Sequence, residues 1–465
     1  MKEKIVNLIA DHVEGMTAEE IATFIEIPPK QELGDYAFPC FRLAKTMHKA
    51  PNLIAADIKE AIGDVDFLDK IDVQGAYLNF FVKKDIFVQT MIEAALKDNF
   101  GGSDEGADKV ICIDYSSPNV AKNFHVGHLR TTIIGNSLYK IYSKLGYKVI
   151  RINHLGDWGT QFGKLIVAYK NWGTKEAVEK DGVAELMRLY VKFHEEADKN
   201  PELVDEARAW FSKMEHGDEE ALSIWQWFKD ISLVEYKRTY DLLGMDFDYY
   251  LGESFYRDKC QEVVDQLTNA NLLKESEGAM IVDLSDYDMA PCIVTKKDGS
   301  SIYATRDLAA IFYRKNTYHF TKCLYVTGQE QKLHFAQVFK VVELLGNDWA
   351  KDSLVHIPYG LVSLEGAKLS TRSGNIIYAE DILHDAIKKS FEIISEKSPN
   401  LPDKEEVAKI VGVGSVLFND LYNQRIKDVS FSWDKVLNFD GETGPYVQYT
   451  HARCSSVVRL AENFD

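Results

Sequence analysis

Two histidines lie three residues apart in the segment His125-Val126-Gly127-His128. In the first turn of a helix this spacing puts both imidazoles on one side, and Gly127 lets a nucleotide approach the backbone closely. The free N–H groups and the dipole at a helix start also favour anions. The segment therefore predicts a turn that donates hydrogen bonds to phosphate. The alternative is an ordinary helix start with two incidental histidines.

A basic loop flanked by glycines runs from Glu365 to Asn375 and contains Lys368, Ser370 and Arg372. Cations in such a loop can neutralise the negative charge that grows on a departing pyrophosphate. Taken alone, a loop of this kind is more often a solvated surface turn. In the same chain as the histidine turn, it favours a second part of one phosphate-handling site.

The histidine turn lies between a predicted strand and a predicted helix. The apolar, β-branched run at 109–114 predicts the strand, and the pattern at 129–145 predicts a helix that Gly146 ends. A second strand at 147–152 completes a βαβ unit, the building block of a doubly wound parallel sheet. Ligands bind at the carboxyl ends of such strands, which is where the histidine turn lies.

The remaining patterns divide the chain into three predicted domains. Residues 1–100 indicate a small α+β domain, and the Gly-rich segment at 100–106 indicates a linker. Residues 108–378 indicate the α/β catalytic domain, with a helical insertion at about 165–275. β pattern resumes at 279–284 and 292–295, and further parallel strands are expected at 322–327 and 355–364. Residues 379–465 are predicted to be helical.

Length and composition exclude several classes of protein. The chain has 465 residues, of which 46% are hydrophobic, so two to four domains with buried cores are expected. A net charge of -18 argues against a uniformly basic nucleic-acid binder, but it allows one basic face. The six cysteines form no C-x-x-C pair, so neither a zinc ribbon nor a disulfide framework is expected. No apolar run reaches the roughly 18 residues of a membrane span, and no signal peptide is evident, which indicates the cytoplasm.

The histidine turn and the basic loop, in this order, resemble the H-x-G-H and K-M-S-K-S signatures of class I aminoacyl-tRNA synthetases. Within that class, longer strings resemble the arginyl-tRNA synthetases: Ser117–Lys122, Gly156–Phe162, Tyr303–Asp307 and Gly444–Tyr449. Two strings near the amino end, Gly34–Ala37 and Leu78–Phe81, resemble the domain that this family uses against the outer corner of tRNA. The resemblance covers nearly the whole chain. It implies a Rossmann-like catalytic domain between an α+β and an all-α domain.

The resemblance implies an arginine–tRNA ligase. Such an enzyme activates L-arginine with ATP to arginyl-adenylate and pyrophosphate, and then transfers arginine to the 3'-terminal adenosine of its tRNA. ATP with Mg²⁺ is the expected substrate, without zinc or an organic cofactor. The implied catalytic residues are His125, His128, Lys122 and Lys368, and Gly127, Ser370 and Arg372 are also implied to bind ATP. Thr371 stands where the signature loop usually has a second lysine, and relatives that lack this lysine carry one before the histidine motif, here Lys122.

Recognition of arginine requires carboxylates, because the guanidinium is a planar, permanently charged fork of donors. Asp307 and Asp114 are the candidates, and Tyr303 lies four residues before Asp307, on the same face of a helix. A solvated carboxylate, or an ion pair with Arg306 or Arg314, is the alternative for Asp307. The resemblance assigns the backbone end of the amino acid to Ser117, Asn119, His128 and Gln331. A fully paired pocket rejects lysine, so no editing domain is expected.

The segment 379–465 resembles the first part of an all-helical domain that reads the anticodon. Because this domain is longer in the family, we expect either a truncated chain or a shortened homologue, and the pattern favours truncation. Tyr446, Tyr449 and Arg453 are expected to contact tRNA. The predicted partners are the cognate arginine tRNA, L-arginine and ATP, with no membrane, and the predicted state is a monomer.

Two other functions fit part of the pattern. A nucleotidyltransferase that makes a small-molecule adenylate shares the histidine turn and the fold. It gives no reason for the amino-terminal domain or for the Tyr303 to Asp307 segment. A non-catalytic, RNA-binding paralogue would be expected to lose a histidine, Lys368 or Asp307, and all of these are present.

Overall fold

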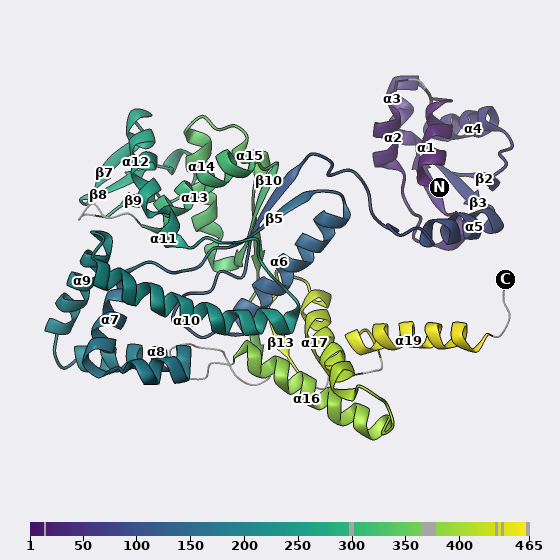
Figure 1. Cartoon of the computed structure of the whole chain (residues 1–465). Helices are drawn as coiled ribbons and strands as arrows, with labels where there is room; N and C mark the ends of the chain where they lie inside the picture. The colour runs from purple at the N-terminus through teal and green to yellow at the C-terminus, as the bar shows by residue number, and fades with distance from the viewer. Residues whose placement is uncertain (14, 297–301, 365–377, 433–435, 439–440, 462–465) are drawn as a thin grey trace. The chain divides into compact units, whose positions relative to one another are not determined.

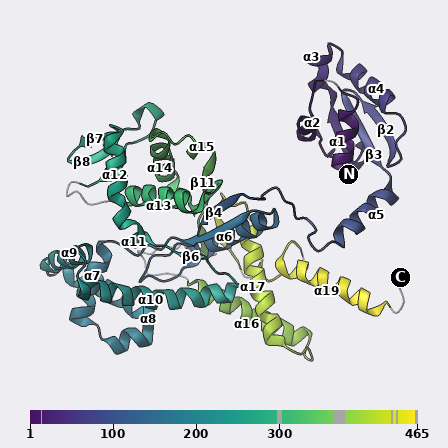
Figure 2. The same cartoon turned by 45° about the horizontal axis from the view of Figure 1, so that its top comes forward.

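The computed structural model describes residues 1–13, 15–296, 302–364, 378–432, 436–438 and 441–461. The chain forms two compact units, Met1–Gly102 and Ser103–Asp465. Their elements are labelled in Figure 1, and Figure 2 shows the same chain turned by 45°. Lys368, Ser370 and Arg372 lie outside the described residues.

The first unit is an antiparallel sheet covered by helices. Strands β1 (Tyr36–Pro39), β3 (Tyr77–Val82) and β2 (Leu68–Gln74) lie in that order. The helices are α1 (Lys2–Ala10), α2 (Ala18–Phe24), α3 (Ala44–Met47), α4 (Pro51–Ile62) and α5 (Lys84–Ala95). Apolar residues spaced along α1 and α4, such as Ile5, Ile9 and Ile54, are fully buried against Phe38 and Phe80 of the sheet. The predicted α+β character of this part is confirmed.

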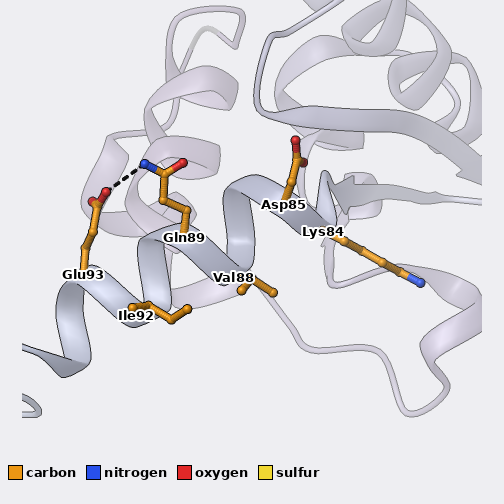
Figure 3. Close-up of a pocket in the computed structure, with 6 residues that line it drawn as sticks. All are labelled: Lys84, Asp85, Val88, Gln89, Ile92 and Glu93. Carbon is orange, nitrogen blue, oxygen red and sulfur yellow. Dashed lines mark hydrogen bonds between the residues drawn. The ribbon is translucent and has the colours of Figure 1, made fainter. Parts of the chain in front are cut away.

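Helix α5 exposes apolar side chains and carries a shallow surface hollow of about 490 Å³. The hollow is lined by residues of one helix face and its flanks: Lys84, Asp85, Val88, Gln89, Ile92 and Glu93 (Figure 3). None of the residues predicted to act on ATP or arginine lines it.

The second unit is built on a five-stranded parallel sheet with the order β11-β10-β4-β5-β6. The strands are β4 (Val110–Asp114), β5 (Lys148–Asn153), β6 (Tyr249–Tyr250), β10 (Lys322–Gly328) and β11 (Leu354–Tyr359). Side chains alternate between the two faces. Ile111 and Ile113 pack with α6 (Val126–Lys144), whereas Cys112 packs with α13 (Tyr303–Tyr318) and α14 (Lys332–Leu344). Helices thus cover both faces, and the predicted doubly wound fold is confirmed.

A helical layer is inserted after β5 and has its own core. It consists of α7 (Thr160–Trp172), α8 (Lys175–Ala197), α9 (Glu202–Glu215) and α10 (Glu219–Leu243), packed around residues such as Phe162, Phe193 and Phe228. The predicted insertion at about 165–275 also covered α11 (Glu253–Tyr256) and α12 (Cys260–Asn269). The sequence pattern did not predict β6, which lies within this range and is an edge strand of the parallel sheet. Two residues are too few to give a periodic pattern.

The β pattern predicted at 279–284 and 292–295 forms strands β8 (Ala279–Val282) and β9 (Cys292–Thr295), which make a separate antiparallel sheet with β7 (Leu273–Ser276). One other predicted β segment differs from expectation. The single strand predicted over 355–364 is wrong, because the chain turns at Gly360. After this turn β12 (Val362–Leu364) pairs with β13 (Val429–Phe431) in a two-stranded parallel sheet. A Cβ at Gly360 would lie 2.5 Å from the carbonyl carbon of Lys427, so the close approach of these two segments requires glycine.

The last part of the second unit is mainly helical. Helices α16 (Ala379–Lys397) and α17 (Lys404–Tyr422) pack with α6 through Leu383, Ala386 and Val416. Helix α19 (Gly444–Leu460) buries only Gly444 and Pro445. Within the described ranges, no helix has the length and apolar character needed to cross a bilayer.

Candidate active site

The histidine turn forms the amino end of α6. His125 is the N-cap residue, and its Nδ1 accepts the backbone N–H of Gly127 at 3.0 Å. The Nδ1 of His128 accepts the backbone N–H of His125 at 3.3 Å, and the two rings stack with their centres 3.9 Å apart. Because each Nδ1 accepts a hydrogen bond, each neutral ring carries its proton on Nε2. The turn therefore offers two N–H donors.

Both imidazoles are held in the neutral form. Burial lowers the pKa of His125, and the neighbouring charge of Lys122 lowers it further. Burial also lowers the pKa of His128 well below its usual range, with smaller contributions from His125 and Lys122. At neutral pH the local positive charge therefore comes from Lys122, whose side chain is exposed. A neutral donor beside a cation suits an anionic ligand.

The loop between β4 and α6 has an unusual backbone. Ser116, Ser117 and Ala121 have φ angles of 70°, 46° and 60°, in the left-handed region that side chains rarely adopt. Helix α10 holds the loop in place, since the phenol of Tyr236 donates to the carbonyls of Asn119 and Lys122, at 2.6 Å in each case. Backbone strain of this kind persists only where surrounding contacts enforce it, and it is concentrated at functional sites.

Asp114 differs from the expectation of a carboxylate that is open to a substrate. It is buried at the end of β4, and its Oδ2 lies 2.8 Å from Nη2 of Arg314. The hydroxyl of Ser117 donates to Oδ1 at 2.9 Å. Both oxygens thus already have partners inside the protein, and the ion pair ties α13 to the central strand.

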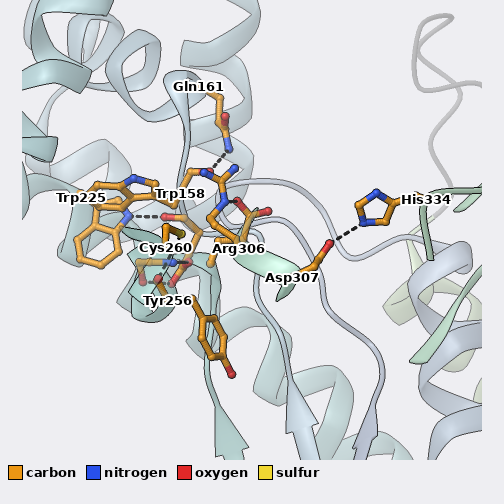
Figure 4. Close-up of polar contacts among 11 residues, drawn as sticks. Trp158, Gln161, Trp225, Tyr256, Cys260, Arg306, Asp307 and His334 are labelled. Carbon is orange, nitrogen blue, oxygen red and sulfur yellow. Dashed lines mark hydrogen bonds and ion pairs between the residues drawn. The ribbon is translucent and has the colours of Figure 1, made fainter. Parts of the chain in front are cut away.

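Asp307 lies in the first turns of α13. Its Oδ2 is 2.6 Å from Nε2 of His334 (Figure 4), and its side chain is 21% exposed. Neither ion pair considered as the alternative for Asp307 is present, because Arg306 pairs with Glu253 and Arg314 with Asp114. The contact that the structure records is with a histidine that the sequence analysis did not single out.

Glu253 is a candidate that the sequence analysis missed. Its Oε2 lies 3.0 Å from Nε of Arg306, and burial raises its pKa to about 7, with further upward contributions from Asp307 and Asp157. The carboxyls of Glu253 and Asp307 are therefore close enough to influence each other. A signal existed, since Glu253 follows the carboxyl end of β6, but the strand itself was not predicted.

Asp157 holds the Glu253 segment in place. Its carboxylate accepts from the amide of Ser254 at 2.8 Å, from the hydroxyl of Ser254 at 2.7 Å and from the ammonium of Lys229 at 2.6 Å. The indole of Trp225 donates to its carbonyl at 2.7 Å (Figure 4). A Cβ at Gly252 would lie 2.4 Å from this carboxylate. The tight fit explains the glycine before Glu253.

Three of the other predicted site residues lie along the same edge of the sheet, because the loops after parallel strands meet there. Ser117 and Asn119 follow β4, and Gln331 follows β10 with its side chain exposed. Tyr303 begins α13 and is 68% exposed. Tyr446, Tyr449 and Arg453 lie elsewhere, on the exposed part of α19, where the Arg453 guanidinium is 5.8 Å from the Tyr449 ring centre.

Two family models match the chain. One is described as "tRNA synthetases class I (R), catalytic domain" and matches residues 90–433. The other is "Arginyl tRNA synthetase N terminal domain" and matches residues 2–82. Among curated proteins, the arginine–tRNA ligase of Alkaliphilus metalliredigens is 58% identical over 463 residues, which cover 99% of this chain and 82% of the relative. That of Clostridioides difficile is 56% identical over the same share of each chain.

Solved structures show the same fold at lower identity. The arginyl-tRNA synthetase of Thermus thermophilus superposes with a TM-score of 0.83 at 24% identity, covering 100% of this chain and 83% of that one. The arginyl-tRNA synthetase of Plasmodium falciparum gives a TM-score of 0.80 at 22% identity, covering 100% and 81%.

Proposed function

This chain belongs to the arginyl-tRNA synthetases, and from that membership we infer that it is an arginine–tRNA ligase. It activates L-arginine with ATP, giving arginyl-adenylate and pyrophosphate, and transfers arginine to the 3'-terminal adenosine of its tRNA. We propose that activation takes place at the carboxyl edge of the parallel sheet. The stacked, neutral pair of His125 and His128 at a strand-to-helix turn is the observation that carries this proposal.

In the proposed activation step, a carboxylate oxygen of arginine attacks the α-phosphorus of ATP, and the bond to the pyrophosphate oxygen breaks. Negative charge grows on the phosphate oxygens. The Nε2–H groups of His125 and His128 donate to these oxygens, and Lys122 and Lys368 neutralise the charge. Gly127, Ser370 and Arg372 complete the proposed ATP contacts. No protein nucleophile takes part.

We propose that Mg²⁺ enters as part of the ATP substrate. Among the described residues, no group of three or more His, Cys, Asp or Glu side chains could form a protein cage for a metal ion. Mg²⁺ commonly keeps several waters and binds to substrate phosphates. There it offsets the charge of the pyrophosphate.

The proposed arginine pocket uses Asp307 as the main acceptor for the guanidinium, with Tyr303 one helical turn away. The structure gives Asp114 two internal partners, so we propose that Asp114 acts through Arg314, by fixing α13, instead of touching the guanidinium. We propose Glu253 as the second carboxylate, because it lies close to Asp307 and its recorded ion pair, with Arg306, involves Oε2, whereas both oxygens of Asp114 have partners. Ser117, Asn119, His128 and Gln331 are proposed to hold the carboxylate and ammonium end of arginine.

The parts proposed to contact tRNA lie outside this pocket. We propose that residues 1–100 recognise tRNA, that residues 108–378 catalyse and that residues 379–465 belong to the anticodon-binding domain. The exposed Tyr446, Tyr449 and Arg453 suit stacking and phosphate contacts. We further propose a monomer that works in the cytoplasm.

Pyrophosphate exchange tests the proposed function. With labelled pyrophosphate, ATP and each amino acid in turn, with and without arginine tRNA, label is expected to enter ATP only in the presence of arginine. A pocket of paired carboxylates leaves donors and acceptors unmatched when lysine binds, and the expected preference is about 10⁴-fold. Exchange with lysine or glutamine but never with arginine would contradict the assignment.

Arginine affinity should depend on pH through Glu253. Because the pKa of Glu253 is raised to about 7, lowering the pH through this value adds a proton and removes the charge that attracts the guanidinium. Arginine should therefore bind about tenfold more weakly at pH 6 than at pH 8, as calorimetry can measure. In Glu253→Gln the affinity should be low and nearly independent of pH over this range. Glu275→Gln, an exposed carboxylate on β7, is the control and should keep the parental profile. A flat profile in the parent protein would exclude this role for Glu253.

A further inference from the structure

Arg130 is a buried cation on α6, two residues after His128, and it is only 1% exposed. Its guanidinium donates to four backbone carbonyls. Nη1 bonds Gly360 at 2.8 Å and Leu361 at 3.2 Å, and Nη2 bonds Arg425 at 3.1 Å and Lys427 at 3.2 Å. One side chain of the catalytic helix thus holds two segments that are more than sixty residues apart in sequence.

Arg130 also pairs with a carboxylate whose side chain is only 10% exposed. Nε of Arg130 lies 3.5 Å from Oδ1 of Asp420 on α17. Burial raises the pKa of Asp420 to about 6, and the Arg130 charge opposes this shift. A buried guanidinium is stable only when its donors are satisfied, and the four Nη hydrogen bonds here require the two segments to be in place together.

The two segments are also bound to each other. The amide of Gly360 donates to the carbonyl of Arg425 at 3.0 Å, and the amide of Leu361 donates to the carboxylate of Asp428 at 2.7 Å. The amide of Val429 donates back to the carbonyl of Leu361 at 2.9 Å, at the start of the β12–β13 pair. Arg130 lies on this junction and connects it to α6.

Strand β12 ends at Leu364, four residues before Lys368 in the sequence. The described chain resumes at Tyr378, where the amide of Ala379 donates to the carbonyl of Phe124 at 3.0 Å. The side-chain amide of Asn123 also donates to the phenol of Tyr378 at 3.2 Å. The described residues that precede and follow the Lys368 segment in sequence are therefore both bonded to the histidine turn or to its helix. Arg130 makes the bonds to the preceding residues, Gly360 and Leu361.

We propose that Arg130 is a positioning residue for the activation step. It fixes the turn at Gly360 and Leu361, and with it β12, relative to His125 and His128. The two phosphate-handling parts of the enzyme act on the same ATP, so an error in their separation weakens stabilisation of the transition state. This inference rests on the proposed function and adds to it a residue that touches neither substrate.

Arg130→Lys tests the proposal in the full chain. Lysine keeps the positive charge, but its three donors on one atom cannot span four carbonyls. We expect kcat for pyrophosphate exchange to fall by about 10²-fold, because a displacement of about 1 Å between groups that act in the reaction can lower the rate by this factor. The KM values for arginine and ATP should stay within about threefold, since neither ligand touches Arg130. A merely structural role would lower the melting temperature and leave kcat per folded molecule unchanged, and that result would overturn the proposal.

Two further variants keep the test decisive. Asp428→Ala removes the acceptor of the Leu361 amide from an exposed position, and it should lower kcat by about threefold even if Arg130→Lys folds poorly. Arg151→Lys is the matched control. Arg151 lies on β5, away from the junction, and the substitution breaks its two hydrogen bonds with Asp248, at 2.7 and 3.2 Å, so kcat should not change. An unchanged kcat in Asp428→Ala would refute the proposal. No exchange in the parent enzyme would instead refute the proposed function.

Discussion

Replacing Asp307 with asparagine is expected to lower kcat/KM for arginine by about 10³-fold in pyrophosphate exchange, mainly through KM. The amide has the shape of the carboxylate but not its charge, so a charge-assisted contact with the guanidinium is lost. Breaking one partner of a desolvated charge pair also leaves the other charge poorly compensated. Asp307 lies only 21% exposed at the start of α13, where solvent can replace little of this interaction. Initial rates over a range of arginine concentrations measure the effect.

The Asp307→Asn result needs a control for loss of a carboxylate in general. Asp265→Asn on α12 removes an exposed carboxylate that accepts from Gln261 on the same helix, and it should behave like the parent enzyme. The melting temperature of Asp307→Asn should stay near that of the parent, because asparagine can still accept from His334. A kcat/KM within a few fold of the parent would remove Asp307 from the guanidinium contact and leave Glu253 as the main acceptor.

The carboxylates Asp114, Asp307 and Glu253 show which parts of the proposed site the sequence alone could not predict. The position of Asp307 one helical turn after Tyr303 was predictable, because local spacing carries that information. Asp114 and Glu253 were not distinguishable in this way. Whether a carboxylate faces a ligand or an internal arginine depends on contacts across the sheet, and Arg314 is two hundred residues from Asp114 in sequence. Whether a carboxylate pairs with an arginine of the protein or with a ligand is therefore decided by tertiary contacts, which the local sequence does not show.

The fold shows the same division between local and distant information. The βαβ unit around the histidine turn was predictable, since β4, α6 and β5 each have enough residues to show their period. Strand β6 has two residues, and its place at the sheet edge follows from pairing with β5. The break at Gly360 likewise follows from the approach of Lys427, which no local pattern records.

The properties of the histidine turn follow partly from local sequence and partly from contacts between distant segments. The sequence predicted a phosphate-handling turn, but not the protonation of its rings. That depends on which nitrogen accepts a backbone N–H, and both Nδ1 atoms do so. The neutral state follows from burial and from Lys122. The proposed donors are therefore the two Nε2–H groups, which leads to a specific substitution.

His128→Asn is expected to lower kcat for pyrophosphate exchange by about 10²-fold. The asparagine oxygen can take the place of Nδ1 and accept the His125 amide, so the helix start is kept. The Nε2–H donor is lost, and removal of one preorganised donor to a developing charge costs about 10²–10³ in kcat. Single-turnover formation of the adenylate measures the step directly. His216→Asn, at an exposed histidine that follows α9, is the control and should leave kcat unchanged.

The pH dependence of this loss distinguishes a neutral donor from an imidazolium. Because the pKa of His128 is lowered well below its usual range, the ring is neutral throughout the range from about pH 7 to 8.5, and the ratio of parent to His128→Asn rates should be constant there. An imidazolium would instead lose its proton as the pH rises, and the parent would lose its advantage. A ratio that falls toward one with rising pH would contradict the neutral donor. In the proposed mechanism, Lys122 supplies the charge that the histidines do not carry, three residues before His125.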